Sequence, residues 1–310
     1  MQCAGCELIS LSPQPTRSVL SRHYPADYYT HTRPRLTIKN SLALLAREIS
    51  YQVLGGTGIP AHRSPLKILF TTMLRNNRYL NDLANLDSLP FLRRGAEVLE
   101  VGFGSAAFLD FLVNKGMRCR GVETDPAVVG LARAKGHDVF AGELEQVRFP
   151  PETFDFIRMR HVLEHVRNPR VLLGEAHRIQ KTGGYLHIEV PNAAGLLAKT
   201  FRDRWVQLEA PRHLYHFGPK TLRDLVTRCG YEVASMNFNT EPWHLLGSLQ
   251  YGLNELRTES AKGQSRDRDF WEDGRLSSML RKLARRINAT GFGENIILLA
   301  RKPESLHSHE

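Results

Sequence analysis

The sequence lacks several features that would place the chain in a special class of protein. It has only four cysteines in 310 residues, too few for a disulfide-stabilised scaffold of this length. No stretch approaches eighteen consecutive apolar residues, so no transmembrane helix is expected. The N-terminus has no basic segment followed by an apolar core, so no secretory signal is predicted. A cytoplasmic location is the expectation that follows.

Acidic residues are outnumbered by basic ones, and the formal net charge is +10. An excess of this size is compatible with an acidic partner such as nucleic acid, an anionic lipid or a phosphorylated substrate. Many enzymes are equally basic without binding polyanions, so charge alone leaves the partner open. The fractions of hydrophobic residues (42%) and charged residues (24%) are ordinary for a globular protein.

From residue 96 onward, short β-branched runs alternate with helical stretches, a pattern that predicts βαβ units and a parallel sheet. The expected strands are 96–101, 118–122, 138–140, 154–159, 185–190, 231–237 and 295–300. One expected helix begins at Asn168-Pro169, because Asn is a good N-cap and Pro suits the first helical position. We expect that helix to stop before Gly183-Gly184.

The regions outside this alternating pattern are expected to be mostly helical. Residues 34–90 predict a helical N-terminal extension, and residues 240–290 predict a helical insertion within a domain that spans residues 91–302. Within the insertion, 275–287 has an apolar stripe and several basic residues, so it could contact an anionic membrane surface or pack against the domain. Residues 303–310 are expected to be a disordered tail.

The end of the first predicted strand carries a glycine-containing turn. Gly102 and Gly104 allow a tight bend and a close approach of a ligand. Glu123, at the end of the second strand, can accept hydrogen bonds from both hydroxyls of a ribose. With Ala107 the two glycines also fit the relaxed dinucleotide pattern G-x-G-x-x-A, which leaves a nicotinamide enzyme open. The carboxylate of Glu100 would repel a pyrophosphate but suits a cofactor that bears an ammonium group.

Several motifs in the right order resemble those of class I S-adenosylmethionine-dependent methyltransferases. V-L-E-V-G-F-G-S-A is similar to motif I of that family, and G-V-E-T-D-P is similar to its second-strand motif. F-D-F-I-R-M-R-H-V-L-E-H-V-R-N-P, G-G-Y-L-H-I-E-V-P-N and P-R-H-L-Y-H-F-G-P-K-T-L resemble segments of the subgroup that includes ubiquinone-biosynthesis O-methyltransferases. The resemblance covers residues 96–238 and the final strand.

This resemblance implies an α/β fold of the Rossmann-like type. It has a seven-stranded, mostly parallel sheet with helices on both faces, and its last strand is antiparallel. Its cofactor is S-adenosylmethionine. The third glycine of motif I is replaced here by Ala106. Because alanine is small, we expect cofactor binding to survive this change.

The resemblance also implies a set of cofactor-binding residues near the ends of the first four strands. They are Glu100, Gly102, Gly104, Ser105, Glu123, Thr124, Glu143, Leu144, Arg160 and His161. It places Glu100 near the amino group of the methionine moiety, Glu123 at the ribose, and Glu143 at the adenine amino group.

A hydroxyl acceptor needs a base, and histidine is the usual one near neutral pH. His161 is the first candidate, because open α/β sheets bind ligands at the carboxyl edge of their strands. His165 and His213 are further catalytic candidates. The segment that contains His213 and His216 could cover the site as a lid. Trp205 could line the acceptor pocket or belong to the core.

Residues 1–33 resemble the end of a zinc ribbon, because Cys3 and Cys6 form a C-x-x-C motif. A structural zinc requires four ligands, and the second C-x-x-C of such a ribbon is missing from this chain. We therefore interpret the segment as a remnant of a ribbon, and for the chain as given we predict no metal.

The primary hypothesis is a methyltransferase acting on an oxygen, less favourably a nitrogen or carbon, of a small-molecule, glycan or lipid-linked acceptor. An RNA methyltransferase is an alternative that the charge supports, although no RNA-binding module is recognised. A non-catalytic binding protein with the same fold is a third hypothesis. The sequence does not indicate the oligomeric state.

Overall fold

A computed structural model describes residues 1–23, 94–256 and 274–304 of the chain. The helices expected within 34–90 lie outside the described residues, as do the middle of the expected insertion and most of the expected tail. Within the described part of the chain, the structure contains no helix long and apolar enough to cross a membrane.

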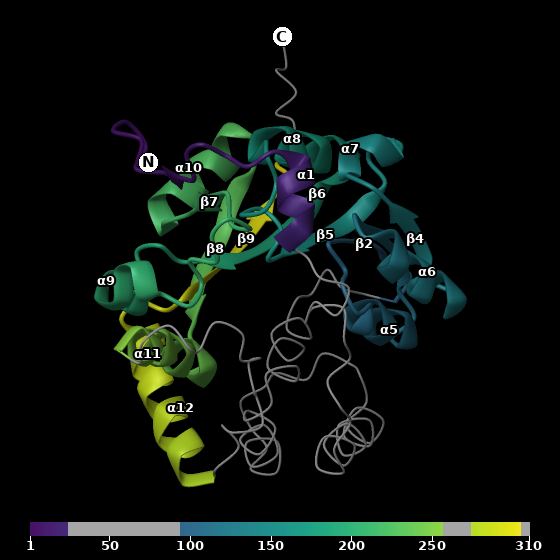
Figure 1. The fold of residues 1–310 in the computed structure, drawn as a ribbon. Helices are drawn as coiled ribbons and strands as arrows, with labels where there is room; N and C mark the ends of the chain where they lie inside the picture. The colour runs from purple at the N-terminus through teal and green to yellow at the C-terminus, as the bar shows by residue number, and fades with distance from the viewer. Residues whose placement is uncertain (24–93, 257–273, 305–310) are drawn as a thin grey trace, which may run out of the picture.

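The structure is built on a seven-stranded sheet with the strand order β4-β3-β2-β5-β6-β9-β8 (Figure 1). The first five strands in chain order run parallel, and β9 is antiparallel to both of its neighbours, β6 and β8. Their bounds are β2 Glu97–Val101, β3 Arg118–Glu123, β4 Asp138–Ala141, β5 Phe154–Arg160, β6 Gln180–Pro191, β8 Glu232–Asn239 and β9 Asn295–Arg301. The predicted Rossmann-like fold with an antiparallel last strand is confirmed.

Helices cover both faces of the sheet because successive strand residues point to opposite sides. In β2, Val98 packs with residues of α5 (Ala107–Asn114), whereas Leu99 belongs to the large core with α8 (Pro169–Ile179). Near β3 and β4, α6 (Pro126–Ala134) joins α5, and α7 (Leu144–Val147) and α10 (Pro219–Arg228) lie on the α8 side.

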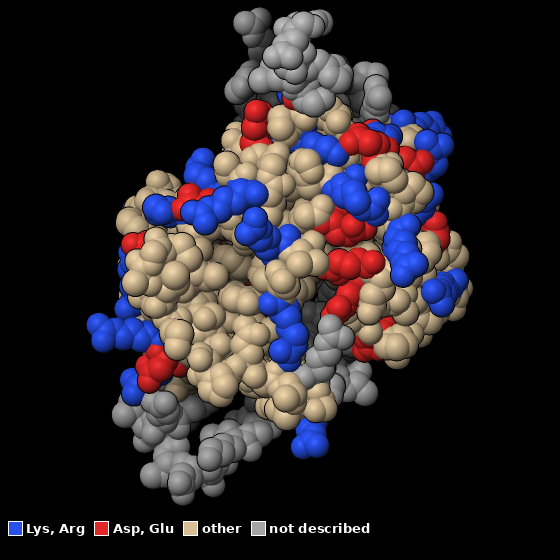
Figure 2. All heavy atoms as spheres, turned by 90° about the horizontal axis from the view of Figure 1, so that it is seen from above, with Lys and Arg blue, Asp and Glu red and all other residues tan. Residues whose placement is uncertain are grey.

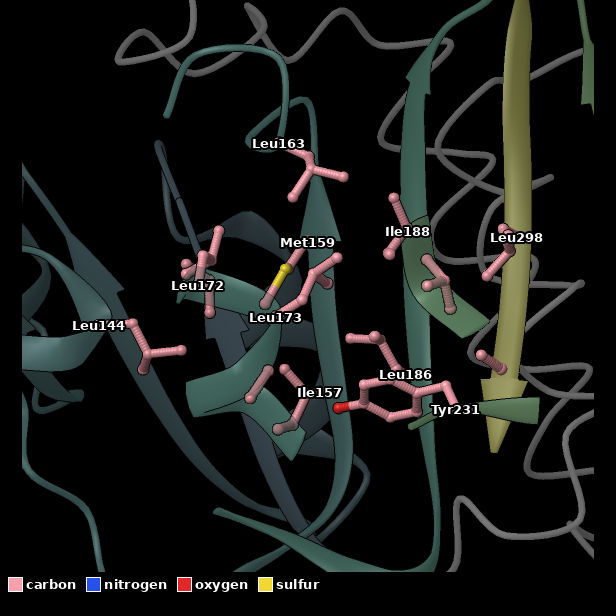
Figure 3. Close-up of a cluster of buried hydrophobic side chains, with 14 of the residues drawn as sticks. Leu144, Ile157, Met159, Leu163, Leu172, Leu173, Leu186, Ile188, Tyr231 and Leu298 are labelled. Atoms are coloured by element: carbon pink, nitrogen blue, oxygen red, sulfur yellow. The ribbon is translucent and has the colours of Figure 1, made fainter. Parts of the chain in front are cut away.

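The large core lies between the central strands and α8 (Figure 3). Leucine, isoleucine and methionine side chains from β5, β6 and β9 meet those of α8 there, and almost all of them are fully buried. Tyr231 closes one end of this core and donates its hydroxyl hydrogen to Gln180 Oε1 at 2.8 Å. That bond satisfies two polar groups that would otherwise be costly to bury.

Helix α8 begins where the sequence predicts, and the strand after it begins earlier than predicted. Asn168 Oδ1 accepts a hydrogen bond from the Val171 amide at 3.2 Å, and Pro169 is the first helical residue. The helix ends at Ile179, and β6 starts at Gln180. Gly183 and Gly184 therefore lie inside a strand, where a Cβ on Gly184 would come within 2.8 Å of the Lys181 carbonyl oxygen. The pairing with β5 jumps here from Gln180 to Tyr185, so the glycine pair lies in an irregular stretch of β6 where Gly183 has a φ of 79°.

The insertion contributes two helices to the described structure, α11 (Pro242–Leu256) and α12 (Gly274–Ala289). From the predicted apolar stripe of α12, Leu280 and Ile287 are buried together with Ala284, whereas Met279 is 60% exposed and Leu283 is 42% exposed. The stripe is therefore only partly used for packing in the described structure. A contact of this helix with a membrane stays a prediction.

The shorter elements lie at the N-terminus and between β6 and α10. They are β1 (Ile9–Ser10), α1 (Arg17–Leu20), η1 (Ser21–His23), α9 (Leu196–Phe201), η2 (Arg202–Arg204) and β7 (Tyr215–His216). β1 pairs with β7 in a small antiparallel sheet, and Thr221 donates a hydrogen bond to the Cys6 carbonyl. The first residues of the chain thus lie against the segment between β6 and α10.

Candidate functional site

The chain bends sharply between β2 and α5, and three of its residues adopt left-handed backbone conformations. Gly102, Gly104 and Ala106 have φ values of 70°, 53° and 58°. A Cβ on Gly102 would lie 2.6 Å from the Val162 side chain, so this position requires glycine for both its conformation and its surroundings. The bend brings the amide of Gly104 to the carboxyl edge of the sheet, next to the end of β3.

Ala106 occupies the position where the family pattern has its third glycine. Its left-handed conformation disfavours any side chain, because Cβ approaches the following carbonyl oxygen. Ala106 is nonetheless buried, with 1% of its surface exposed, and packs in a cluster with Phe103 and Leu109. Ala106 therefore holds a strained conformation at the bend.

Glu123 joins the end of β3 to the bend. Its Oε2 accepts a hydrogen bond from the Gly104 amide at 3.2 Å, and its Oε1 accepts one from the Thr124 amide at 2.7 Å. A carboxylate in this position still has lone pairs that can accept hydrogen bonds from ribose hydroxyls. The pairing of an amide-lined bend with an acid at the next strand end fits a nucleoside cofactor.

Glu100, which the sequence places near the cofactor's amino group, is engaged inside the sheet. Its carboxylate is buried and forms an ion pair with Arg158 of β5, and the Arg158 guanidinium lies 4.1 Å from the centre of the Phe108 ring. Burial raises the pKa of Glu100 to about 7, and the charge of Arg158 offsets part of that rise. If Glu100 contacts a cofactor, its carboxylate must bind the cofactor and Arg158 at the same time.

The remaining predicted cofactor residues lie on both sides of the bend. Ser105 is within the turn itself, and Thr124 donates its hydroxyl hydrogen to Glu123 Oε1 at 3.2 Å. Glu143 is exposed at the start of α7, where its amide donates to Gln146 Oε1 at 2.9 Å, and the Leu144 side chain is buried. The predicted roles of Thr124, Glu143 and Leu144 at the adenine stay predictions.

At the end of β5, Arg160 and His161 converge on one buried acid, Glu189 of β6. Arg160 Nε donates to Glu189 Oε2 at 2.6 Å, and His161 Nε2 lies 3.7 Å from Glu189 Oε1. Burial alone would raise the pKa of Glu189, but Arg160 and His161 hold it well below its usual range. Asn295 of β9 donates to the same carboxylate at 3.0 Å. Glu189 thereby ties the residues after β5 to the C-terminal strand.

His161 has an unusual environment for a predicted base. Its backbone is left-handed, with φ 52°, and its Nδ1 lies 3.1 Å from Glu164 Oε1. Burial would lower the pKa of His161, but the carboxylates of Glu164 and Glu189 outweigh burial and raise it to about 9. His161 is therefore protonated at neutral pH. It would have to lose these two acidic contacts before it could accept a proton.

The other two predicted catalytic histidines lie together, 4.6 Å apart between ring centres. His165 Nδ1 is 3.1 Å from the Arg212 carbonyl oxygen, and His213 Nδ1 is 2.7 Å from that of Gln207. A carbonyl accepts only, so both rings carry a proton on Nδ1 and the lone pair of a neutral ring is on Nε2. Burial holds the pKa of His213 well below its usual range. The structure thus brings His161, His165 and His213 to one region after β5.

The segment that we predicted as a lid is tied down on several sides. The Leu214 amide donates to the Glu164 carbonyl at 2.8 Å, and the Leu11 amide donates to the Leu214 carbonyl at 2.9 Å. His216 is buried, and burial lowers its pKa to about 4. Trp205 is buried and donates its indole N–H to Glu294 Oε2 at 2.8 Å. Opening of this segment would break these contacts, and Trp205 belongs to the packed interior.

A comparison with protein families matches residues 73–236 of the chain to the family described as a methyltransferase domain. The chain belongs to this family. The match covers the bend after β2, the acid at the end of β3 and the cluster after β5. The predicted family is confirmed, and with it the prediction of an S-adenosylmethionine-dependent methyltransferase domain.

Curated proteins similar to this methyltransferase domain include several O-methyltransferases. The malonyl-[acyl-carrier protein] O-methyltransferase of Serratia marcescens is 26% identical over 129 residues, which is 41% of this chain and 50% of that protein. A ubiquinone biosynthesis O-methyltransferase of Rhodopseudomonas palustris is 24% identical over 190 residues, covering 53% of this chain and 72% of that protein. The matched region thus spans only half of the Serratia protein.

Among solved structures, the fold is similar to a chain of the complex between the Haloferax volcanii Trm112 methyltransferase activator and a methyltransferase. The TM-score is 0.50 with 18% sequence identity, and the similarity covers 72% of this chain and 89% of that one. A likeness at this identity shows the fold. It agrees with the strand order of the methyltransferase domain described above.

Three buried acids of the methyltransferase domain were missed by the sequence analysis: Glu164, Glu189 and Glu294. Each is at most 2% exposed. Glu189 and Glu294 stand in or beside otherwise apolar strands, and a carboxylate in such a place is seldom buried without partners. That contrast was the signal available in the sequence. Which groups satisfy them could be seen only in the structure.

Proposed function

We propose that this protein transfers the methyl group of S-adenosylmethionine to an oxygen of a small-molecule, glycan or lipid-linked acceptor. The observation that carries the proposal is the Glu123 carboxylate against the Gly104 amide, at the bend between β2 and α5. When bound, the cofactor supplies a methyl group on a sulfonium, which is already activated for displacement. The protein's task is then to align the acceptor with the methyl group and to exclude water.

On the cofactor side, the amides of the bend would face the carboxylate of the methionine moiety, and Glu123 would hold the ribose hydroxyls. The bend precedes α5, and helix N-termini favour negatively charged groups. The three left-handed residues keep this backbone close to the strand ends. These features support binding of a nucleoside that also carries an amino-acid group.

On the acceptor side, His161 supplies a positive charge and His213 supplies a neutral imidazole. His161, held protonated by Glu164 and Glu189, would position an acceptor through its proton and would not remove one. His213, whose pKa burial holds well below its usual range, carries its lone pair on Nε2, and His165 lies beside it with 4.6 Å between the ring centres. Methyl transfer to oxygen is supported by the relatives from Serratia and Rhodopseudomonas, which are both O-methyltransferases.

Calorimetry with S-adenosylmethionine and with its demethylated product tests the cofactor half of the proposal. We expect wild type to bind both, and Glu123→Ala to bind at least about tenfold more weakly, because a hydrogen bond to a charged group contributes about 1.5–3 kcal/mol. Glu232→Ala is the control, since Glu232 is an exposed acid at the start of β8. Wild type that binds neither compound would favour a non-catalytic protein with this fold.

An RNA acceptor is the alternative that the net charge leaves open. On the face drawn in Figure 2, Lys and Arg side chains are dispersed among acidic and uncharged ones, and acidic side chains line a hollow. That arrangement does not favour a polyanion on this face. Binding to RNA would weaken steeply with added salt, whereas binding of a neutral metabolite would not. A steep salt dependence of acceptor binding would therefore support RNA.

A further inference from the structure

Glu294, the residue before β9, is a buried acid that has no part in the methyl transfer as described above. Each of its carboxylate oxygens accepts a hydrogen bond, Oε1 from the Leu197 amide at 2.7 Å and Oε2 from the Trp205 indole at 2.8 Å. A Cβ on Gly195 would lie 2.9 Å from Oε1, so the backbone approaches this carboxylate closely. The carboxylate therefore ties the start of α9 and the Trp205 ring to the start of β9.

The backbone of Glu294 holds three further residues. Its amide donates to Thr240 Oγ1 at 3.1 Å, and its carbonyl accepts hydrogen bonds from the Asn192 amide at 2.7 Å and from Gln207 Nε2 at 3.0 Å. Because β9 runs antiparallel to β6 and begins opposite its last residue, Glu294 lies at the carboxyl edge of the parallel strands. The proposed acceptor region lies at the same edge of the sheet.

Gln207 links Glu294 to a histidine of that region. Its side-chain amide donates to the Glu294 carbonyl, and its own backbone carbonyl accepts the Nδ1 proton of His213 at 2.7 Å. Gln207 and His213 are 4% and 5% exposed, so water does not compete for either bond. Trp205, two residues earlier, is held by the Glu294 carboxylate. Both ends of the segment 205–207 are thus attached to Glu294.

The position of the Gln207 carbonyl decides which tautomer His213 adopts. A neutral imidazole carries one proton, and the hydrogen bonds around the ring determine which nitrogen holds it. Nδ1 faces the Gln207 carbonyl at 2.7 Å, whereas Nε2 is 3.8 Å from Glu209 Oε2, which is too long for a hydrogen bond. If segment 205–207 moved away from His213, the proton would move to Nε2 and be donated to Glu209 instead.

We propose that Glu294 and Gln207 are positioning residues for the acceptor half of the site, which hold the Gln207 carbonyl against His213 and so keep the lone pair of His213 on Nε2. This role rests on the proposed function, in which an acceptor hydroxyl loses a proton to a base. An imidazole accepts a proton only at the nitrogen that has the lone pair. Fixing the tautomer therefore fixes the side of the ring at which His213 can act.

Long-range proton–nitrogen NMR spectra of the full chain show which ring nitrogen of each histidine is protonated, and the signal that is missing from His213→Asn identifies His213. The spectra are recorded at pH 8, where Glu294 is ionised, because burial raises its pKa only to about 7. We expect wild-type His213 to carry its proton on Nδ1.

Two variants should change that tautomer. Glu294→Gln turns an amide N–H towards the N–H of Leu197 or Trp205, and Gln207→Leu removes the bond to the Glu294 carbonyl. Each should shift the ratio of the two His213 tautomers towards protonated Nε2 by at least about tenfold, the effect expected from the loss of one buried hydrogen bond.

Tyr231→Phe is the matched control for a loss that is only structural, because it breaks the buried hydrogen bond to Gln180 in the large core. We expect it to lower stability in urea unfolding and to leave the tautomer of His213 unchanged. A proton on Nε2 in wild type, an unchanged ratio in both Glu294→Gln and Gln207→Leu, or a shift of equal size in Tyr231→Phe would each overturn the proposal.

Calorimetry with S-adenosylmethionine on the same proteins separates this role from the proposed function. β5 and β6 lie between β2 and β9 in the sheet, so Glu294→Gln and Gln207→Leu should bind the cofactor as wild type does. Loss of cofactor affinity in both variants would overturn the positioning role, because the two residues would then support the whole domain. Wild type that has the expected tautomer but binds no S-adenosylmethionine contradicts the proposed function and leaves the control of the tautomer standing.

Discussion

Arg158 of β5 lies directly opposite Glu100 of β2 in the parallel sheet, and its guanidinium donates to the Glu100 carboxylate in the buried layer under α5. Removal of one partner of such a pair leaves an uncompensated buried charge. We expect Arg158→Met to lower the free energy of unfolding by about 3–5 kcal/mol at pH 8, where Glu100 is ionised. Urea unfolding measures this loss.

The double variant Arg158→Met/Glu100→Gln is the control for that measurement, because it removes both charges together. It should recover much of the stability lost by the single variant, since a buried pair is replaced by groups that carry no charge. A loss below 1 kcal/mol for Arg158→Met, or no recovery in the double variant, would show that the pair contributes little.

Gly102 is expected to tolerate no side chain, in contrast to the glycine of α6. Gly102→Ala combines a left-handed backbone with a contact of 2.6 Å to Val162, and should cost about 2 kcal/mol or more. Gly130→Ala, at an exposed helical position with no atom within 4 Å of a new Cβ, should instead raise stability by about 0.5–1 kcal/mol. Thermal or urea unfolding of both variants measures the contrast. Equal effects would mean that the bend is not constrained as described.

Ala106 should rank between glycine and valine in stability. Ala106→Gly relieves a left-handed conformation that costs about 1–2 kcal/mol. The greater freedom of glycine in the unfolded chain offsets about 0.5–1 kcal/mol of that gain in stability. A β-branched residue is a strong outlier at positive φ, so Ala106→Val should be destabilised and bind S-adenosylmethionine more weakly. Calorimetry alongside unfolding measures both properties, and a valine variant as stable as wild type would contradict the assigned conformation.

Glu294 should make stability depend on pH in a defined window. Burial raises its pKa to about 7, although the Leu197 amide and the Trp205 indole oppose the rise. The unfolded chain releases this proton near pH 4.3. Between these values the folded state binds more protons, so the contribution of this group is complete below about pH 4.3 and is lost as pH rises towards 7.

The stability of wild type relative to Glu294→Gln should therefore fall by on the order of 2–3 kcal/mol between pH 4.5 and pH 7 and level off above it. Urea unfolding across this range gives the difference at each pH. Parallel curves for the two proteins would show that Glu294 titrates normally.

The helix starts and the βαβ units could be predicted from the sequence, because each depends on residues that are close together in the chain. Asn168 and Pro169 begin a helix wherever they precede an amphipathic segment, and the strand spacing around Gly102 and Gly104 is characteristic of a βαβ unit. The start of β6 was predicted too late because Gly183 and Gly184 indicate a loop when only neighbours in sequence are considered. In the structure, these glycines lie in an irregular stretch of β6 between Gln180 and Tyr185, where a Cβ on Gly184 would come within 3.0 Å of the Asp155 carbonyl oxygen of β5.

The site was less predictable, because its side chains are paired across the sheet. Glu100 and Arg158 are 58 residues apart in sequence, and only the register of β2 against β5 brings them together. His161 was identified as a ligand-facing residue, but its raised pKa depends on Glu164 and Glu189 together. The location of functional residues at strand ends follows from topology, whereas their protonation follows from contacts that the sequence does not display.

The position of β9 between β6 and β8 also has a consequence for biosynthesis. Among the residues that the structure describes, β8 makes its ladder contacts with β9 only, so this edge of the sheet cannot assemble until β9 has been synthesised. Until then the backbone of β6 has no partner on the side where β9 will pair with it. Glu189 also lacks its hydrogen bond from Asn295. A nascent chain halted before β9 would expose an unpaired apolar strand edge, to which chaperones and proteases bind.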